Sequence, residues 1–210
     1  MIRVTIADDH AVVRRGLSDI LRQSGDIDVI AEAEDGDALL AALRQREPDV
    51  AVMDLRMPGP SGLDLVKHLR AEFPDLHLLV LSAHPEDQYA VRVVRAGAAG
   101  YLTKESAEAE LVSAVRRVAG GKKYLTPGMA EALLAQLDSD PNEAPHAQLS
   151  DREFQVMRLI ASGLPVSKVA EELSLSVKTI STYRTRLLQK MGMANNAEIT
   201  RYALEQGLVD

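Results

Sequence analysis

Five side chains that could take part in phosphoryl transfer lie at the ends of apolar stretches in the first half of the chain. Asp8 and Asp9 follow the first stretch, Asp54 and Ser82 end the third and fourth, and Lys104 follows the fifth. Three carboxylates held together would repel one another, and a hard divalent ion such as Mg²⁺ would offset that repulsion. Beside such an ion a carboxylate can attack phosphorus and become the covalent acceptor, while an ammonium group neutralises the phosphoryl oxygens. These residue types therefore predict a Mg²⁺-dependent phosphoryl-acceptor site, if the fold brings them together.

The elements that must position these side chains alternate between strands and helices. Residues 50–53 and 78–81 are apolar throughout, which is expected of strands that are buried on both faces. Five strand–helix alternations predict an α/β domain, a five-stranded doubly wound parallel sheet with helices on both faces. In this fold the carboxyl ends of the strands share one edge, which would bring the polar side chains together. The predicted strands are residues 3–7, 27–31, 50–53, 76–81 and 100–102.

Composition excludes several classes of protein. The chain has 210 residues and no Cys, so disulfide frameworks and thiolate metal sites are excluded. No apolar run approaches the ~20 residues of a membrane span, and the first residues show no secretory signal. We therefore expect a cytoplasmic protein. The formal net charge of −7 argues by itself against a general polyanion binder.

That charge is unevenly distributed along the chain. Residues 1–123 carry a net charge of −4, residues 124–147 also −4, and residues 148–210 carry +1. The stretch 138–145 is acidic, contains two prolines and has no apolar residue larger than Ala besides them, which predicts a flexible linker. The predicted parts are a first domain over residues 1–121, a linker over 122–147 with one helix at 127–137, and a second domain over 148–210.

An all-helical domain is predicted after the linker. Ser150 and Glu153 have the spacing of a capping box, which begins a helix. Three residues separate the second and third predicted helices, as in a helix-turn-helix. Residues 174–197 carry a net charge of +4, and a helix with small hydroxyl side chains between cations suits the major groove of DNA. The predicted helices are residues 151–161, 166–173, 177–191 and 197–206.

The strand-end residues of the first domain resemble the receiver domain of bacterial response regulators, which is flavodoxin-like. The resemblance extends over residues 2–120. The segments that carry it are Asp8-Asp9, Asp54-Leu55-Arg56-Met57-Pro58-Gly59, Ser82-Ala83 and Gly100-Tyr101-Leu102-Thr103-Lys104.

This resemblance implies a role for each of these side chains. Asp54 is implied to be the phosphoacceptor, and Ser82 and Lys104 are implied to contact the phosphoryl oxygens. Tyr101 resembles the aromatic switch residue, whose ring moves inward as Ser82 is drawn to the phosphate. Many receivers have Pro after the lysine, where this chain has Glu105. The implied Mg²⁺ ligands are Asp9 and Asp54 directly, Asp8 through water, and the backbone carbonyl of Arg56.

Residues 149–209 resemble the LuxR-type helix-turn-helix domain. The resemblance implies that residues 177–191 form the recognition helix and residues 197–206 a dimerising helix. Many members have His-Val where this chain has Tyr183-Arg184, so Arg184 would either reach a DNA phosphate or bond a neighbouring helix end. The implied DNA-binding residues are Lys178, Thr179, Ser181, Thr182, Arg184, Thr185, Arg186 and Lys190.

The chain as a whole is thus similar to two-domain response regulators of the NarL/FixJ type, which are not enzymes acting on other substrates. The implied partners are a sensor histidine kinase, promoter DNA, a second copy of the chain and RNA polymerase, with no membrane. One alternative is a phosphotransferase or phosphatase with Asp54 as nucleophile, but no second general acid or cap insertion accompanies it. The other is a phosphorylation-independent helix-turn-helix regulator with a vestigial receiver, which the intact acidic set disfavours.

Overall fold

The computed structural model describes residues 1–60, 62–82, 88–138, 145–173 and 175–209. The chain divides into two compact units, Met1–Leu133 and Leu134–Asp210. Helix α6 (Pro127–Asp138) spans the division between them. Among the described residues, no helix is both long enough and apolar enough to cross a membrane.

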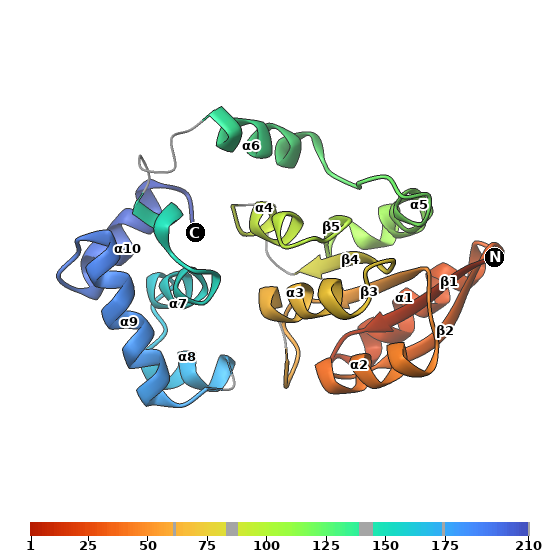
Figure 1. Cartoon of the computed structure of the whole chain (residues 1–210), viewed down its shortest axis with the longest axis horizontal. Coiled ribbons are helices and arrows are strands. Elements are labelled where there is room, and N and C mark those ends of the chain that lie inside the picture. Colours follow the sequence, from red (N-terminus) through yellow and green to blue (C-terminus); the bar gives the residue numbers. More distant parts are fainter. Residues whose placement is uncertain (61, 83–87, 139–144, 174, 210) are drawn as a thin grey trace. The chain divides into compact units, whose positions relative to one another are not determined.

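Unit 1 contains a five-stranded parallel sheet with the strand order β2-β1-β3-β4-β5 (Figure 1). The chain runs from β1 outward to β2, then returns to place β3 on the other side of β1, so the connections reverse between β1 and β3. The predicted doubly wound parallel sheet is therefore confirmed. A crevice outside the strand ends at such a switch point is where open α/β sheets bind ligands. The strands are β1 Ile2–Ala7, β2 Ile27–Ala33, β3 Val50–Asp54, β4 His77–Ser82 and β5 Gly100–Thr103.

Both faces of this sheet are covered by helices. Helices α1 (Ala11–Gln23) and α5 (Ala107–Ala119) share one hydrophobic core with inward-facing residues of the strands, including Val4, Ile6 and Val52. Every residue of β3 is buried, as its unbroken apolar run predicts. The remaining helices of the sheet connections are α2 Gly36–Gln45, α3 Gly62–Glu72 and α4 Gln88–Arg95.

The residues directly after α5 are bonded to unit 1. Tyr124 forms a parallel bridge with Gly100, and its backbone nitrogen donates to the carbonyl of Ala99 at 2.9 Å. The Lys123 ammonium donates to the carbonyl of Ala98 at 2.6 Å, and the Tyr124 hydroxyl donates to Glu110. This segment therefore pairs with the start of β5, which explains why the compact unit extends past the predicted boundary at residue 121. A side chain at Gly100 would lie 2.9 Å from Tyr124 Cβ, so glycine permits this approach.

Unit 2 is all-helical, as predicted. The predicted capping box is present, because Ser150 Oγ accepts from the backbone nitrogen of Glu153 while the Glu153 carboxylate accepts from that of Ser150. The helices pack around Phe154, Val156, Ile180, Leu187 and Ile199, all fully buried. A short 3₁₀ turn η1 (Pro145–Gln148) precedes α7 Asp151–Ala161, α8 Val166–Glu172, α9 Val177–Met191 and α10 Asn196–Glu205.

Candidate functional site

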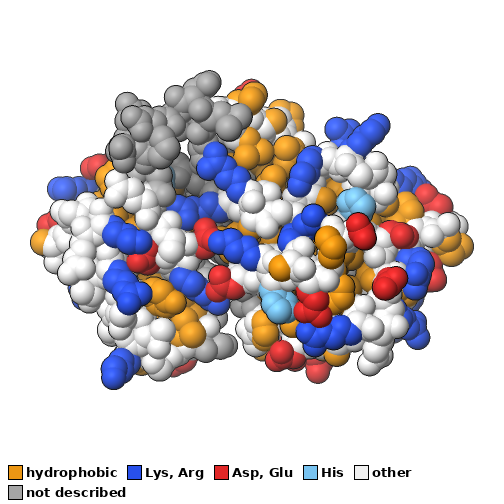
Figure 2. Space-filling view, in the orientation of Figure 1, with side chains coloured by type: hydrophobic (Ala, Val, Ile, Leu, Met, Phe, Trp, Pro, Cys, Tyr) orange, Lys and Arg blue, Asp and Glu red, His pale blue; other side chains and the backbone are white. Residues whose placement is uncertain are grey.

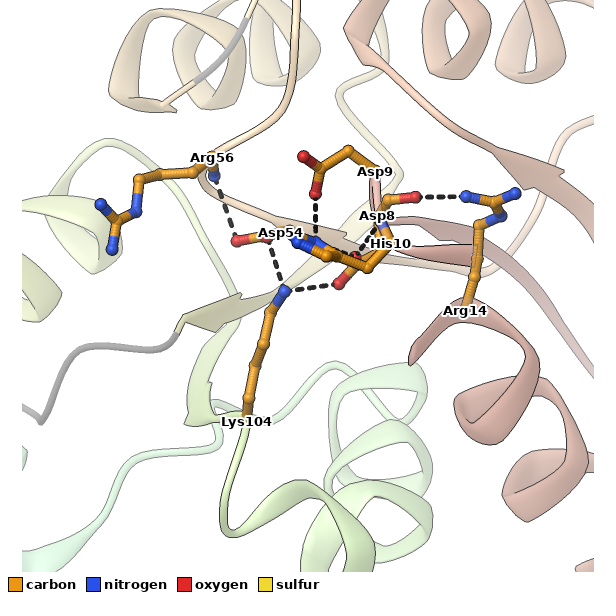
Figure 3. A network of polar contacts seen from close by, with 7 residues as sticks. All are labelled: Asp8, Asp9, His10, Arg14, Asp54, Arg56 and Lys104. Carbon is orange, nitrogen blue, oxygen red and sulfur yellow. Dashed lines mark hydrogen bonds and ion pairs between the residues drawn. The ribbon is translucent and has the colours of Figure 1, made fainter. Parts of the chain in front are cut away.

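Asp8 and Asp54 lie at the switch point of the sheet, where Asp8 follows β1 and Asp54 ends β3. Their side chains are 0% and 7% exposed. The Lys104 ammonium, from the loop after β5, lies 2.7 Å from Asp8 Oδ2 and 2.7 Å from Asp54 Oδ2 (Figure 3). The fold therefore brings two carboxylates from distant strand ends to one ammonium group from a third segment.

Burial and the shared lysine set the protonation of this cluster. Burial raises the pKa of Asp54, helped by the nearby charge of Asp8, although bonds from Lys104 and from the Arg56 backbone partly oppose that rise. Burial alone would lower the pKa of Lys104, but its bonds to Asp54 and Asp8 raise it overall. Lys104 therefore remains a cation, while the ionised form of Asp54 is disfavoured until more positive charge is supplied.

Two residues that the sequence prediction missed also belong to this cluster. The His10 backbone nitrogen donates to Asp8 Oδ1 at 2.8 Å, and its ring Nδ1 lies 2.7 Å from Asp9 Oδ1 (Figure 3). Arg14 Nη1 donates to the backbone carbonyl of Asp8 at 2.6 Å. The sequence signal that could have found His10 is its position directly after the two aspartates. The spacing between the histidines of the chain does not indicate a shared site.

The donor set in this pocket fits the predicted divalent cation. One potential ligand atom from each of Asp8, Asp9, His10 and Asp54 lies within 4.8 Å of all the others. Three of these four residues offer carboxylate oxygens, the donors that Mg²⁺ prefers. The backbone nitrogen of Arg56 donates to Asp54 Oδ1 at 3.1 Å, which holds that carboxylate beside the loop. The carbonyl of Arg56 stays a predicted ligand.

The other predicted receiver residues lie beside this pocket. Ser82 ends β4 and is 3% exposed, and its carbonyl accepts from the Lys104 backbone nitrogen at 2.8 Å. This bond joins the loop that carries the ammonium to the strand that carries the hydroxyl. Tyr101 on β5 is fully buried, so its ring lies inside the protein in this structure. Ala83, which contributed to the receiver resemblance, lies outside the described residues.

In unit 2, helix α9 has the two faces that its sequence predicts. Ile180, Leu187 and Met191 are buried, and the opposite face is exposed. Three hydroxyls on that face donate to backbone carbonyls four residues earlier, at 2.8 to 3.0 Å. Because these protons are directed to the backbone, the oxygens present acceptor lone pairs outward. The exposed face consists of Lys178, Ser181, Thr182, Thr185, Arg186 and Gln189.

The other three predicted DNA-binding residues form bonds within unit 2. Arg184 Nε donates to Asn196 Oδ1 at 2.6 Å, which is the neighbouring-helix-end alternative considered above. The hydroxyl of Thr179 lies 2.8 Å from Ser176 Oγ, at the start of α9. Lys190 Nζ donates to Glu153 Oε2 at 2.6 Å. Their contact with DNA stays a prediction, and the structure gives each of them a role inside the domain.

Glu153 is the buried carboxylate that receives the Lys190 ammonium. Burial by itself would raise the pKa of Glu153, but the bonds from Lys190 and Ser150 outweigh it and lower the pKa overall. The carboxylate is therefore ionised at neutral pH, and its Oε2 accepts from three donors. This pair joins the start of α7 to the end of α9, and so it helps to orient the helix that presents the exposed face.

On the face shown in Figure 2, the surface charge does not form one large field of a single sign. Lys, Arg, Asp and Glu side chains are interspersed there over both units. The cationic character of α9 is therefore local. It depends on the few exposed bases of that helix and not on the net charge of the chain.

Comparison with known protein families decides what kind of protein this is. The response regulator receiver domain matches residues 4–116, and the luxR family of bacterial regulatory proteins matches residues 147–203. The chain belongs to the response regulators. Its receiver precedes a LuxR-type helix-turn-helix domain, as in the NarL/FixJ group, so this response regulator is a DNA-binding member of a two-component system.

Full-length relatives of this response regulator share both domains. It is 37% identical over 209 residues to the response regulator UvrY of Escherichia coli K12, covering 99% of this chain and 96% of UvrY. It is 36% identical over 211 residues to the response regulator GacA of Pseudomonas aeruginosa, covering 100% of this chain and 99% of GacA.

A solved structure of RcsB shows the same two folds. RcsB of Salmonella enterica serovar Typhimurium, bound to the promoter rprA in the presence of the phosphomimetic BeF₃⁻, is 28% identical with a TM-score of 0.68. That match covers 96% of this chain and 97% of the RcsB chain.

Proposed function

We propose that this response regulator accepts a phosphoryl group on Asp54 from a sensor histidine kinase, and that the phosphorylated form dimerises and binds promoter DNA through α9. The observation that carries the proposal is the shared ammonium of Lys104, 2.7 Å from both Asp8 and Asp54 at the switch point of the sheet. The exposed arc of α9, with its bases and hydroxyls, supports the DNA-binding half of the proposal. We further propose a cytoplasmic location and RNA polymerase as a partner at the promoter.

The chemistry we propose takes place at a carboxylate oxygen of Asp54. One carboxylate oxygen of Asp54 bonds to phosphorus as the bond between phosphorus and the kinase histidine nitrogen breaks, and the electron pair returns to that imidazole. In this proposal Lys104, which is bonded to Asp54, holds one phosphoryl oxygen, and Ser82 on the neighbouring strand contacts another. When bound by Asp8, Asp9 and Asp54, Mg²⁺ supplies the additional positive charge that stabilises the phosphoryl oxygens.

Coupling to the rest of the chain is proposed to pass through β5. The end of β4 pairs with β5, with Val80 opposite Tyr101 and Ser82 opposite Thr103. The Tyr124 segment is bonded to the start of the same strand. A shift of Ser82 toward a phosphoryl group would therefore alter the position of β5, which contains Tyr101, and of the Tyr124 segment that is bonded to it. Phosphorylation would shift the population between existing conformations.

Phosphorylation by a small donor tests the receiver half. We expect the full chain, treated with acetyl phosphate and Mg²⁺, to gain the mass of one phosphoryl group, and the Asp54→Asn variant to gain none. The matched control Asp75→Asn changes an exposed carboxylate outside the pocket and should be labelled like the wild type. Labelling of Asp54→Asn, or of no form, would contradict the proposal.

DNA binding tests the other half. Phosphorylation should tighten binding of the full chain to its promoter DNA, measured by fluorescence anisotropy. Lys178→Ala and Arg186→Ala should weaken that binding and each reduce the slope of log affinity against log salt by about 1. The control Arg201→Ala removes an exposed base outside α9. Equal affinity before and after phosphorylation would favour the phosphorylation-independent alternative.

A further inference from the structure

His10 places an imidazole among the carboxylates of the receiver pocket, and the proposed phosphoryl transfer gives it no role. Its ring Nδ1 lies 2.7 Å from Asp9 Oδ1 and 3.4 Å from Asp8 Oδ1. The ring is 67% exposed, whereas Asp8 is fully buried. Figure 3 shows the ring beside the acidic side chains and not turned away from them. The imidazole therefore lies on the solvent side of the cluster, where a cation would enter.

The spacing of the donor atoms suits a single ion that touches His10. Ligand atoms around a six-coordinate ion at a bond length of about 2.1 Å are about 3.0 Å apart when adjacent and about 4.2 Å apart when opposite. The donor atoms from Asp8, Asp9, His10 and Asp54 all lie within 4.8 Å of one another. Roughly half an ångström of side-chain adjustment would bring all four to one ion.

The charges in the pocket also favour a cation there. Three carboxylates converge on it, and one ammonium group, that of Lys104, lies between two of them. Arg14 is directed to the backbone carbonyl of Asp8 and toward Glu32, not to the carboxylates of the pocket. Among the described residues, the carboxylates of the pocket thus outnumber the cations that contact them. The remaining negative charge can be neutralised by a divalent ion.

We propose that His10 is a nitrogen ligand of the cation site, and that it gives this receiver higher affinity for transition-metal dications than an all-oxygen pocket would have. Imidazole nitrogen suits ions such as Ni²⁺, whereas Mg²⁺ prefers oxygen donors alone. The inference rests on the cation site of the proposed function and adds His10 to it. The competing role for His10 is a hydrogen bond to Asp9 with no contact to the metal.

Pulsed electron paramagnetic resonance distinguishes these two roles directly. The full chain is loaded with Mn²⁺ at about pH 8, where an unperturbed imidazole is neutral. Its histidines are labelled with the heavier nitrogen isotope, so that the signal of a histidine nitrogen can be distinguished from that of other backbone nitrogens. We expect echo-envelope modulation from a directly bonded histidine nitrogen in the wild type, and no such modulation in His10→Ala.

Two further variants complete the design. His10→Asn keeps a side-chain donor for Asp9 but removes the nitrogen ligand, so it should behave like His10→Ala. His68→Ala removes a histidine that is 53% exposed and pairs with Glu72 on α3, and it should retain the wild-type signal. Thermal unfolding of each variant confirms that it is folded.

Calorimetric binding provides a second measurement on the same proteins. We expect the Ni²⁺ affinity of His10→Ala to fall at least about tenfold, since even outer-shell partners of a metal are worth roughly 10- to 100-fold. The Mg²⁺ affinity should change much less. Absence of a histidine nitrogen signal from bound Mn²⁺, failure of Mn²⁺ to bind, or an unchanged ratio of Ni²⁺ to Mg²⁺ affinity would overturn the proposal. Phosphorylation of Asp54 is measured separately by mass. A failure of the proposed phosphorylation can therefore be distinguished from a failure of His10 to bind the metal.

Discussion

Each unit of this protein contains a lysine bonded to a buried carboxylate, and the two pairs differ in their electrostatics. Lys104 lies 2.7 Å from Asp54 in the receiver, and Lys190 lies 2.6 Å from Glu153 in the helical unit. The pKa of Asp54 is raised above its ordinary value, whereas the pKa of Glu153 is lowered. The two pairs have similar bond lengths, so the difference comes from what else surrounds each carboxylate.

Burial is the main cause of the raised pKa of Asp54, and the receiver pair is also short of positive charge whereas the helical pair is not. Lys104 is shared with a second buried carboxylate, Asp8, so neither carboxylate has a cation of its own. Glu153 has Lys190 to itself and accepts further bonds from the backbone and hydroxyl of Ser150. An incompletely neutralised carboxylate can accept a cation and a phosphoryl group, whereas a carboxylate with an ammonium group of its own is structural.

The largest expected effect is that of removing the receiver lysine. Lys104→Met should slow phosphorylation of Asp54 by about 100-fold or more, because a preorganised charge at the phosphoryl oxygens is lost. The rate of mass gain with acetyl phosphate and Mg²⁺ measures this. The matched variant Lys190→Met should leave the rate unchanged. Similar rates in both variants would remove the functional distinction between the two pairs.

Loss of the helical carboxylate should reduce stability without affecting that chemistry. Glu153→Gln leaves Lys190 without its anion and weakens the start of α7, so we expect the helical unit to lose about 2 kcal/mol. Urea unfolding followed by domain-resolved hydrogen exchange measures it. Glu171→Gln, which breaks an exposed pair with Lys168, should leave this stability almost unchanged. Equal losses in the two variants would show that burial of Glu153 adds nothing.

The corresponding change in the receiver should have the opposite sign. The raised pKa of Asp54 means that its ionised form opposes folding, so Asp54→Asn should stabilise unit 1 by roughly 1 kcal/mol at neutral pH without divalent ions. The same hydrogen-exchange measurement reports it. Destabilisation of unit 1 by this substitution would show that Lys104 fully compensates the burial of Asp54.

The smallest effect is a pH dependence of the helical unit. Because folding lowers the pKa of Glu153 from 4.5, its contribution is present above that value and is lost as pH falls through the folded pKa. The stability difference between wild type and Glu153→Gln should therefore be constant near neutral pH and shrink below about pH 4.5. Urea titrations at a series of pH values measure it. A difference that grows on acidification would contradict the lowered pKa.

Local patterns were sufficient to predict most elements of both units. The apolar run 50–53 predicted a strand buried on both faces, and β3 is buried throughout. The Ser150 and Glu153 spacing predicted a capping box, which is present. These features depend on residues a few positions apart, so a short window of sequence contains the interactions that decide them.

Contacts between distant segments were less predictable. The positions of the strand ends predicted that Asp8, Asp54 and Lys104 lie along one edge of the sheet. They did not predict that two carboxylates share one ammonium group. Nothing local in the sequence pairs Tyr124 with Gly100, and the segment after α5 was therefore predicted as linker. A segment of only a few residues is too short to show a periodic pattern of apolar side chains. Its structure is therefore decided by the strand with which it pairs.

The sequence by itself determined the chemistry of this protein: carboxylates at strand ends for a cation and a phosphoryl group, and a basic helix with small hydroxyls for DNA. Only the tertiary structure decided how individual charges are used. Packing of α7 against α9 directs Lys190 to Glu153, and packing of α10 directs Arg184 to Asn196. The physical reason is that burial makes an unpaired carboxylate costly, and which cation reaches it depends on how the helices pack.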